Sequence, residues 1–190
     1  MLRVDQRRIG LVLFIVGLVL SVLLVAHFKT SPSTAPNLHP AIDKVGPSSV
    51  YPDPIRTPGV NIPSITQSNI QDTICNPDWS TKSIRPSSSY TTKLKHEQMQ
   101  ELHISGDSSD YEEDHLIPLE LGGDPRDPRN LWPEPYSPQP GAREKDVVEN
   151  YLHKEVCAGN MTLEDAQHEI STDWYRVYLS IHPRETQEQR

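Results

Sequence analysis

The sequence predicts an α+β domain that follows a transmembrane helix and a linker. Three observations support this prediction. An apolar run lies near the N-terminus, a proline-rich stretch follows it, and residues 111 to 156 show the order strand, turn, strand, loop, helix. With 190 residues the chain has room for one modest domain once the first two segments are set aside.

Residues 9–27 are assigned to a transmembrane helix. Residues 9 to 26 are apolar apart from two Gly and one Ser, and at 1.5 Å per residue they reach roughly 27 Å, about the thickness of a bilayer core. A cleaved signal peptide is the alternative, but its apolar region is usually only about 7 to 15 residues long. We therefore expect an uncleaved signal anchor.

The charges around this run predict its orientation. Arg3, Arg7 and Arg8 precede it, whereas only Lys29 closely follows. Positive residues favour the cytoplasmic side. We expect a single-pass membrane protein with residues 1–8 in the cytoplasm and the C-terminal domain in the periplasm or outside the cell.

Residues 28–63 have the composition of a linker. Eight prolines fall between residues 30 and 63, with many Ser and Thr and little apolar content. Such a segment cannot bury enough surface to offset the entropy of ordering it, so a disordered tether is expected. Residues 64–190 are predicted to form the extracytoplasmic domain.

The two cysteines of the chain, Cys75 and Cys157, both lie in the predicted domain. In an oxidising compartment they can pair, so a disulfide is expected; two free buried thiols are the alternative. The bond would close a loop of 81 intervening residues, for which chain entropy gives roughly 4 kcal/mol of stability.

The charge balance counts against a module that binds nucleic acid tightly. The chain has 18 Lys and Arg against 26 Asp and Glu, a formal net charge of −8. Proteins that make many phosphate contacts are usually basic. An enzyme whose site charge comes from a bound cation is still compatible with this composition.

Three helices are predicted in the domain. The first is capped by Thr91 or Thr92 and carries His96 and His103 as surface residues. The second covers residues 143–156. Its apolar face comprises Val147, Val148, Tyr151, Leu152 and Val156. The third is capped by Thr162 and runs to about Ile181.

The other face of the second helix is polar. Asp146, Glu149, Asn150 and His153 fall at i, i+3, i+4 and i+7, so they present several oxygens and one imidazole in the same direction. Either this face holds a ligand or it is simply solvated.

Two short apolar runs, HLIPLEL and NLWP, flank a turn rich in Gly and Asp-Pro, which is a hairpin signal. Asp114 and His115 fall on the first predicted strand. Asn130 falls at the start of the second, and Trp132 beside it is expected in the core. A buried polar pair that pins the hairpin is the alternative to a catalytic role for Asp114 and His115.

This arrangement resembles the HNH nucleases, whose ββα-metal core carries an Asp-His or His-His pair, then an Asn, then a His on the following helix. The likeness covers residues 111 to about 156 and includes the Gly122-Gly123 turn. It implies a divalent metal bound by Asp114, a general base at His115 and an orienting role for Asn130. It also implies a small HNH-like core with additional helices.

The residue types suit phosphodiester hydrolysis. The reaction needs a water deprotonated near neutral pH, which an imidazole can do, and a cation that neutralises charge on the phosphate. A carboxylate beside the histidine suits a hard cation. We expect Mg²⁺, Mn²⁺ or Zn²⁺ as cofactor and DNA or RNA as substrate.

One element of the family pattern is missing. The last family residue typically follows the Asn by about nine positions, which here falls near Pro138 and Gln139, in a proline-rich insert that cannot be the middle of a helix. His153 is the candidate that completes the metal site, with Glu149 one helical turn before it.

Arg126 and Arg129 lie in the hairpin turn and at the edge of the second strand, where a guanidinium could reach a scissile phosphate. Surface residues that oppose Asp124 and Asp127 are the alternative.

The sequence thus predicts a metal-dependent, HNH-like nuclease that hydrolyses phosphodiester bonds outside the cytoplasm. The alternative is a non-catalytic, disulfide-stapled binding or structural domain on the same framework. The acidic charge and the missing third element favour this second interpretation.

Overall fold

The computed structural model describes residues 50–183. The predicted cytoplasmic N-terminus, the predicted transmembrane helix and most of the predicted linker lie outside these residues. Within residues 50–183, no helix has the length and apolar character needed to cross a bilayer.

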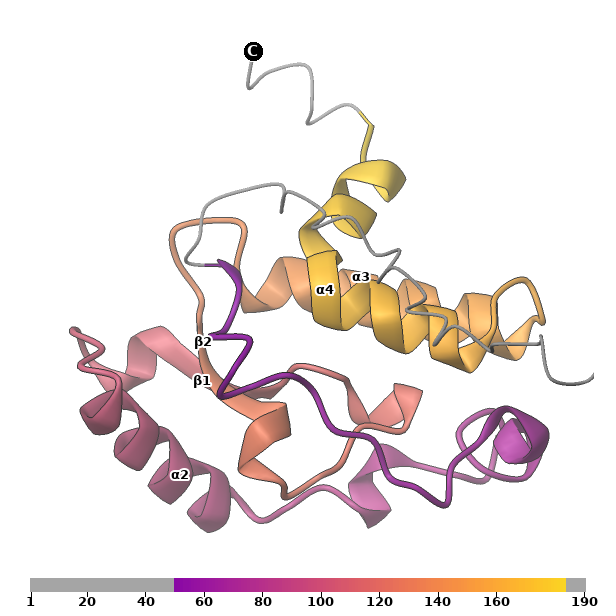
Figure 1. Ribbon diagram of the computed structural model, residues 1–190, viewed down its shortest axis with the longest axis horizontal. Helices are drawn as coiled ribbons and strands as arrows, with labels where there is room; N and C mark the ends of the chain where they lie inside the picture. Colours follow the sequence, from indigo (N-terminus) through magenta and orange to yellow (C-terminus); the bar gives the residue numbers. More distant parts are fainter. Residues whose placement is uncertain (1–49, 184–190) are drawn as a thin grey trace, which may run out of the picture. The chain divides into compact units, whose positions relative to one another are not determined.

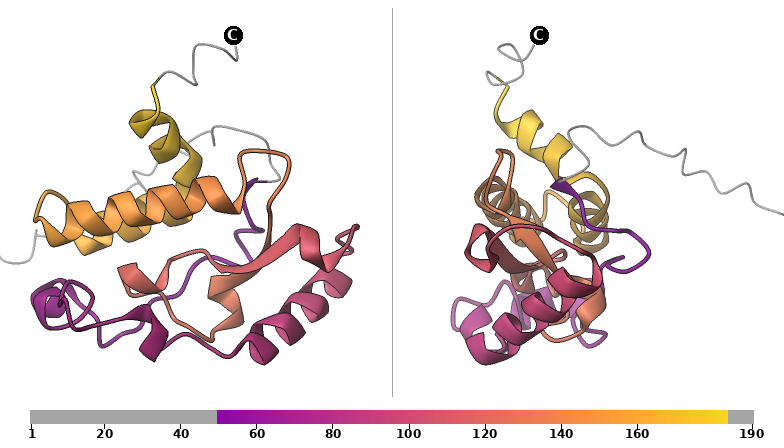
Figure 2. Two further views of the ribbon diagram at one scale, coloured as in Figure 1. Left: turned by 180° about the vertical axis from the view of Figure 1, so that it is seen from behind. Right: turned by 90° about the vertical axis from the view of Figure 1, so that its left-hand side faces the viewer.

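The described chain combines helices with one small sheet, which confirms the α+β class. In chain order the main elements are α2 (Ser88–Glu101), β1 (Tyr111–His115), β2 (Leu131–Pro135), α3 (Ala142–Cys157) and α4 (Leu163–Ile181). Short 3₁₀ helices lie between them: η2 (Gln67–Asp72), η3 (Thr81–Ser83), η4 (Ser108–Asp110), η5 (Leu119–Leu121) and η6 (Pro128–Asn130). Figure 1 shows the hairpin between α2 on one side and the α3–α4 pair on the other, and Figure 2 shows the same layers.

The two strands form the predicted antiparallel hairpin, from the pair Tyr111–Pro135 to the pair His115–Leu131. The first strand lies earlier than predicted, because its apolar run HLIPLEL leaves the sheet after His115 and forms η5. Pro118 lacks an N–H for a ladder bond, and the 3₁₀ turn buries Leu119 and Leu121. Asn130 correspondingly ends η6 instead of starting the second strand.

The core lies between α3, α4 and the η5 turn. Its fully buried side chains include Val148, Leu152, Val156, Ala166, Ile170 and Trp174. Val147 was predicted to face inward but is 42% exposed. The buried stripe is instead Lys145, Val148, Leu152 and Val156, at i, i+3, i+7 and i+11.

α2 departs from its predicted boundaries, whereas α4 follows them. α2 begins at Ser88 with Ser87 as its N-cap, one turn before the predicted threonine caps, and ends before His103, which has a left-handed φ of 54°. α4 follows the prediction, since the Thr162 hydroxyl accepts a hydrogen bond from the Asp165 N–H at 3.0 Å and the helix ends at Ile181.

α4 contains a break that the sequence did not indicate. Asp173 has non-helical φ and ψ of −155° and 63° and is buried. Its carboxylate accepts a hydrogen bond from the Tyr51 hydroxyl and pairs with Arg176. After this residue the helix turns away from α3 (Figure 1).

Residues 50–63, which the composition assigns to the linker, pack against the domain. Val50 is 1% exposed, and its carbonyl accepts a hydrogen bond from the Trp174 indole N–H at 2.9 Å. Asn61 forms a β-bridge with Gly123. The folded unit therefore begins earlier than residue 64.

The expected disulfide is present. Cys75 and Cys157 are bonded, with their Cα atoms 5.4 Å apart. The bond joins the loop after η2 to the last residue of α3, so it fixes the C-terminal end of that helix to a segment more than eighty residues earlier in the chain.

Candidate functional site

The end of β1 carries the Asp114–His115 pair, and the two side chains have different surroundings because successive strand residues face opposite sides. Asp114 lies against α3, where its Oδ2 is 2.6 Å from the Lys145 ammonium nitrogen. His115 is 4% exposed and lies against the loop that precedes η6.

Lys145 is fully buried and links three groups. Its Nζ donates to Asp114, to the His115 carbonyl at 2.8 Å and to Glu149 Oε1 at 2.5 Å. Its role was not predicted from the sequence. The helix periodicity could have indicated it, because this lysine falls on the apolar stripe of α3, where a charged residue needs a buried partner.

A third carboxyl group joins this cluster. Glu134 is fully buried on β2, and the strand register places it on the same face of the hairpin as Asp114. Burial raises the pKa of Glu134 well above its usual range. Neither Glu134 carboxyl oxygen has a hydrogen-bond partner among the described residues, and the nearby Asp114 carboxylate also raises the Glu134 pKa, so this carboxyl group keeps its proton.

Asp114, Lys145 and Glu149 are close enough to one another to shift each other's pKa values. Burial opposes ionisation of Asp114, but the Lys145 ammonium outweighs it and lowers the Asp114 pKa. Burial raises the pKa of Glu149 to about 8. Burial also disfavours the ammonium of Lys145, yet its carboxylate neighbours hold its pKa well above the usual value. We call these four residues the ionic cluster of the hairpin: Asp114, Glu134, Lys145 and Glu149.

The imidazole of His115 is held by one of its nitrogens. Nε2 lies 3.2 Å from the Pro125 carbonyl oxygen, which can only accept, so this nitrogen carries the proton. No residue of the described part of the chain, 50–183, hydrogen-bonds to Nδ1. Burial lowers the pKa of His115. The ring is therefore neutral near pH 7, with its free lone pair on Nδ1.

Asn130 positions His115 through the loop backbone and makes no hydrogen bond to its ring. The amide oxygen accepts from the Ile117 N–H at 2.9 Å, and the amide nitrogen donates to the carbonyls of Ile117 at 2.9 Å and Asp124 at 3.0 Å. The next carbonyl, that of Pro125, is the one that His115 contacts. Asn130, which is fully buried, thus holds the turn whose Pro125 carbonyl orients the imidazole.

His115 borders a polar cavity of about 280 Å³ between β1 and the N-terminal half of α2. Arg85 lies on its rim, is exposed, and forms no salt bridge within residues 50–183. Glu113 lies beside it with both carboxylate oxygens unbonded, and burial raises its pKa to about 8. The cavity is therefore lined by an exposed guanidinium, a neutral imidazole and a Glu113 carboxyl group that keeps its proton at pH 7. Lys95, whose ammonium donates to two backbone carbonyls, and Glu112, which accepts from the Tyr136 hydroxyl, also line it.

The two arginines favoured from the sequence do not border this cavity. Arg129 forms two hydrogen bonds to Asp127, at 2.6 and 3.0 Å, and Arg126 lies over the Tyr90 ring with 5.5 Å between its guanidinium carbon and the ring centroid. Both are exposed. Arg85, in the Ser-Pro loop before α2, was not predicted from the sequence as a site residue, yet it borders the cavity.

The predicted metal ligands are only partly brought together. Asp114 and Glu149 meet at Lys145, but His153 lies elsewhere, with Nε2 at 2.9 Å from the Ile74 carbonyl oxygen and 3.4 Å from Cys157 Sγ. Within residues 50–183, the one group of three metal-ligating side chains with closely spaced ligand atoms is Cys75, His153 and Cys157.

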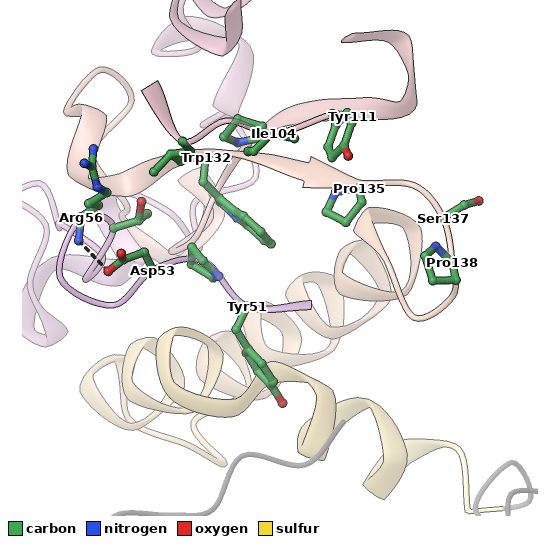
Figure 3. Close-up of a pocket in the computed structure, with 13 residues that line it drawn as sticks. Tyr51, Asp53, Arg56, Ile104, Tyr111, Trp132, Pro135, Ser137 and Pro138 are labelled. Atoms are coloured by element: carbon green, nitrogen blue, oxygen red, sulfur yellow. Dashed lines mark hydrogen bonds between the residues drawn. The ribbon is translucent and has the colours of Figure 1, made fainter. Parts of the chain in front are cut away.

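A second cavity, of about 370 Å³, lies on the other part of the hairpin. Figure 3 shows Trp132 pointing into it from β2, with Tyr51 and Pro135 nearby. Its charged lining residues are engaged, since Asp53 accepts from the backbone and Arg56 pairs with Glu101. As expected, Trp132 is buried. This cavity offers mainly apolar surface.

Comparisons with known proteins add no family assignment. No family model, no curated protein and no solved structure matches this chain.

Proposed function

We propose that the domain hydrolyses phosphodiester bonds of nucleic acid on an HNH-like framework, with His115 as the general base. The observation that carries the proposal is the state of His115. Its ring is oriented by the Pro125 carbonyl, kept neutral by burial and placed at the edge of a polar cavity that also holds Arg85. A general base needs this combination of orientation, protonation state and access.

In the proposed reaction a water molecule in the cavity transfers a proton to Nδ1 of His115 as its oxygen attacks the phosphorus atom. The bond from phosphorus to the leaving oxygen then breaks. Arg85 neutralises charge on the phosphate, for which a planar guanidinium is well suited. Asn130 acts as a positioning residue, because it holds the loop that orients the imidazole.

The residues expected to hold the metal do not form a ready site. Carboxylate oxygens of Asp114 and Glu149 are the ligands that Mg²⁺ and Mn²⁺ prefer, but the Lys145 ammonium already lies between them. His153, the third expected ligand, is bonded beside the disulfide. The proposal therefore depends on His115 and Arg85. The cleavage assay below tests whether the reaction also needs a divalent metal ion.

A non-catalytic binding or structural domain is the second candidate. It is favoured by the Lys145–Asp114 pair, which occupies the carboxylate that the nuclease interpretation assigns to a metal, and by the net charge of −8. The ionic cluster would then serve only to join α3 to the hairpin.

The test uses the full-length chain in mild detergent with plasmid DNA and single-stranded RNA, in EDTA and then with Mg²⁺, Mn²⁺ or Zn²⁺ added. We expect cleavage by the wild type and a loss of about 10²- to 10⁴-fold in His115→Ala. The matched control is His96→Ala, which changes an exposed histidine on α2 and should retain full activity.

Arg85→Gln should weaken substrate binding and slow cleavage, whereas Arg129→Gln should do neither. If the wild type cuts neither substrate under any condition, the nuclease proposal is lost. Calorimetry without divalent binding, or with binding unchanged in Asp114→Ala, would then support the non-catalytic domain.

A further inference from the structure

The corner of the domain around the disulfide contains more than a covalent link. His153 lies one helical turn before Cys157 on α3, and both point to the loop that carries Cys75. All three residues are half-buried, and their ligand atoms lie within 4.8 Å of one another. Two thiols and an imidazole are a ligand set that Zn²⁺ favours.

We propose that reduction of the Cys75–Cys157 disulfide converts this corner into a zinc site with Cys75, Cys157 and His153 as its three protein ligands. The inference does not depend on the proposed nuclease function. A dithiol supplies two electrons and two protons, the S–S bond breaks to give two thiols, and the dithiol becomes a disulfide. Binding of Zn²⁺ then releases the two thiol protons.

The distances fit a shared metal ion. In tetrahedral zinc sites with Zn–S near 2.3 Å and Zn–N near 2.0 Å, a sulfur and a nitrogen ligand lie roughly 3.6 Å apart. The His153 nitrogen and Cys157 sulfur are already 3.4 Å apart. The two sulfurs must separate from bonding distance to roughly 3.7 Å, which rotation of the side chains allows with the Cα atoms 5.4 Å apart.

The site is open to solvent on one side. Cys75, Cys157 and His153 line a cavity of about 310 Å³ together with Glu120. One Glu120 oxygen is buried without a hydrogen-bond partner, and its carboxyl group lies close enough to His153 for their charges to interact. A cation would be favoured here, and a water molecule in the cavity could complete the fourth position, as in zinc sites with three protein ligands.

Disulfide and metal exclude each other at this corner, because both use the same two sulfurs. Metal binding would therefore favour the reduced form by mass action. The His153 contact to the Ile74 carbonyl must also be given up, since Nε2 loses its proton when it binds a metal.

The test uses the full-length chain in mild detergent, oxidised or treated with a phosphine reductant, and titrated with Co²⁺ as a spectroscopic probe and then Zn²⁺. We expect one Co²⁺ per reduced chain with a thiolate-to-cobalt absorption band, displaced by Zn²⁺, and no band in the oxidised chain. His153→Ala should weaken binding at least tenfold, and His96→Ala should leave it unchanged.

Near-ultraviolet circular dichroism reports whether the reduced domain keeps its packing. If reduction loosens the domain, added Zn²⁺ should restore the signal of the buried tryptophans in the wild type and not in Cys75→Ser. The proposal is overturned if reduced, folded protein shows no thiolate band, if His153→Ala binds as tightly as the wild type, or if Zn²⁺ fails to restore a loosened domain.

Discussion

The two ends of α3 are attached to the rest of the domain in different ways. At the C-terminal end Cys157 is joined covalently to Cys75. At the N-terminal end buried Lys145 binds Asp114 and the His115 carbonyl on β1, close to Glu134 on β2. One helix thus connects the candidate catalytic hairpin to the disulfide.

The two attachments of α3 should respond to different solution conditions. A disulfide stabilises by limiting the unfolded chain, and its contribution does not change with protonation while it stays oxidised. Buried ionic groups stabilise only while their charges are matched, because an unmatched buried charge is costly. The N-terminal end should therefore respond to pH and the C-terminal end to redox conditions.

Removing the disulfide should have the largest effect. The double substitution Cys75→Ser and Cys157→Ser frees a loop whose ends are 82 positions apart, so the free energy of unfolding should fall by about 4 kcal/mol. Urea unfolding followed by tryptophan fluorescence measures the loss. The loss should be the same at pH 5.5 and pH 8; a loss that changes strongly with pH would remove the distinction between the two ends.

Lys145→Met should cost about 3 kcal/mol at pH 7, because it leaves buried carboxyl groups without their cation. The loss should be smaller at pH 5, where protons can replace the ammonium. Lys154→Met, at an exposed position of the same helix, is the control and should stay within about 0.5 kcal/mol. Equal effects of the two substitutions would show that the ionic cluster is not a stabilising attachment.

The middle of α3 should depend on packing alone. Val148 is fully buried, so Val148→Ala should cost about 2 kcal/mol from lost burial and the cavity left behind. Val147 is 42% exposed, and Val147→Ala should cost less than about 0.5 kcal/mol. Both values come from urea unfolding at pH 7. If the two substitutions cost similar free energies of unfolding, Val148 would not be the more deeply buried of the two, and the described orientation of α3 would be wrong.

The pH dependence of stability should be the smallest effect when it is counted per pH unit. Burial raises the pKa of Glu149 and of Glu113 to about 8 in the folded chain, from 4.5. The folded state therefore binds more protons than the unfolded state between about pH 5 and pH 8, so the free energy of unfolding falls as pH rises through this window.

Glu149→Gln removes one of these groups, and the slope should become shallower by roughly 1 kcal/mol per pH unit. Glu97→Gln, at an exposed position of α2, should leave the slope unchanged. Urea unfolding at pH 5, 6, 7 and 8 measures both. A wild-type stability that rises between pH 5 and pH 8 would contradict the raised pKa values.

Much of the candidate site was visible in the sequence because its residues sit in one short stretch. Asp114 and His115 are neighbours on β1, and Asn130 follows the turn that joins the strands. The role of Asn130 was less visible: it orients His115 through two backbone carbonyls, and a hydrogen bond to the backbone has no residue pattern. His153 was expected beside Asp114, but the helix directs it to Cys157.

The main helices, the hairpin and their order could be predicted from the sequence alone. Two apolar runs on either side of a turn rich in Gly and Asp-Pro predicted the hairpin, 3.6-residue periodicity predicted α3 and α4, and the presence of two cysteines predicted their bond. Each of these follows from neighbours in the chain or from a choice with few alternatives.

Which charged residues meet in the folded domain could not be predicted from the sequence. Lys145 contacts Asp114 from 31 positions away, and Arg85 reaches the cavity at His115 from a loop outside the hairpin. The physical reason is that periodicity specifies which side of an element is buried but not which residue it meets there. The pKa of a buried ionisable group depends on the partner that it meets, and so does the chemistry that the site can perform.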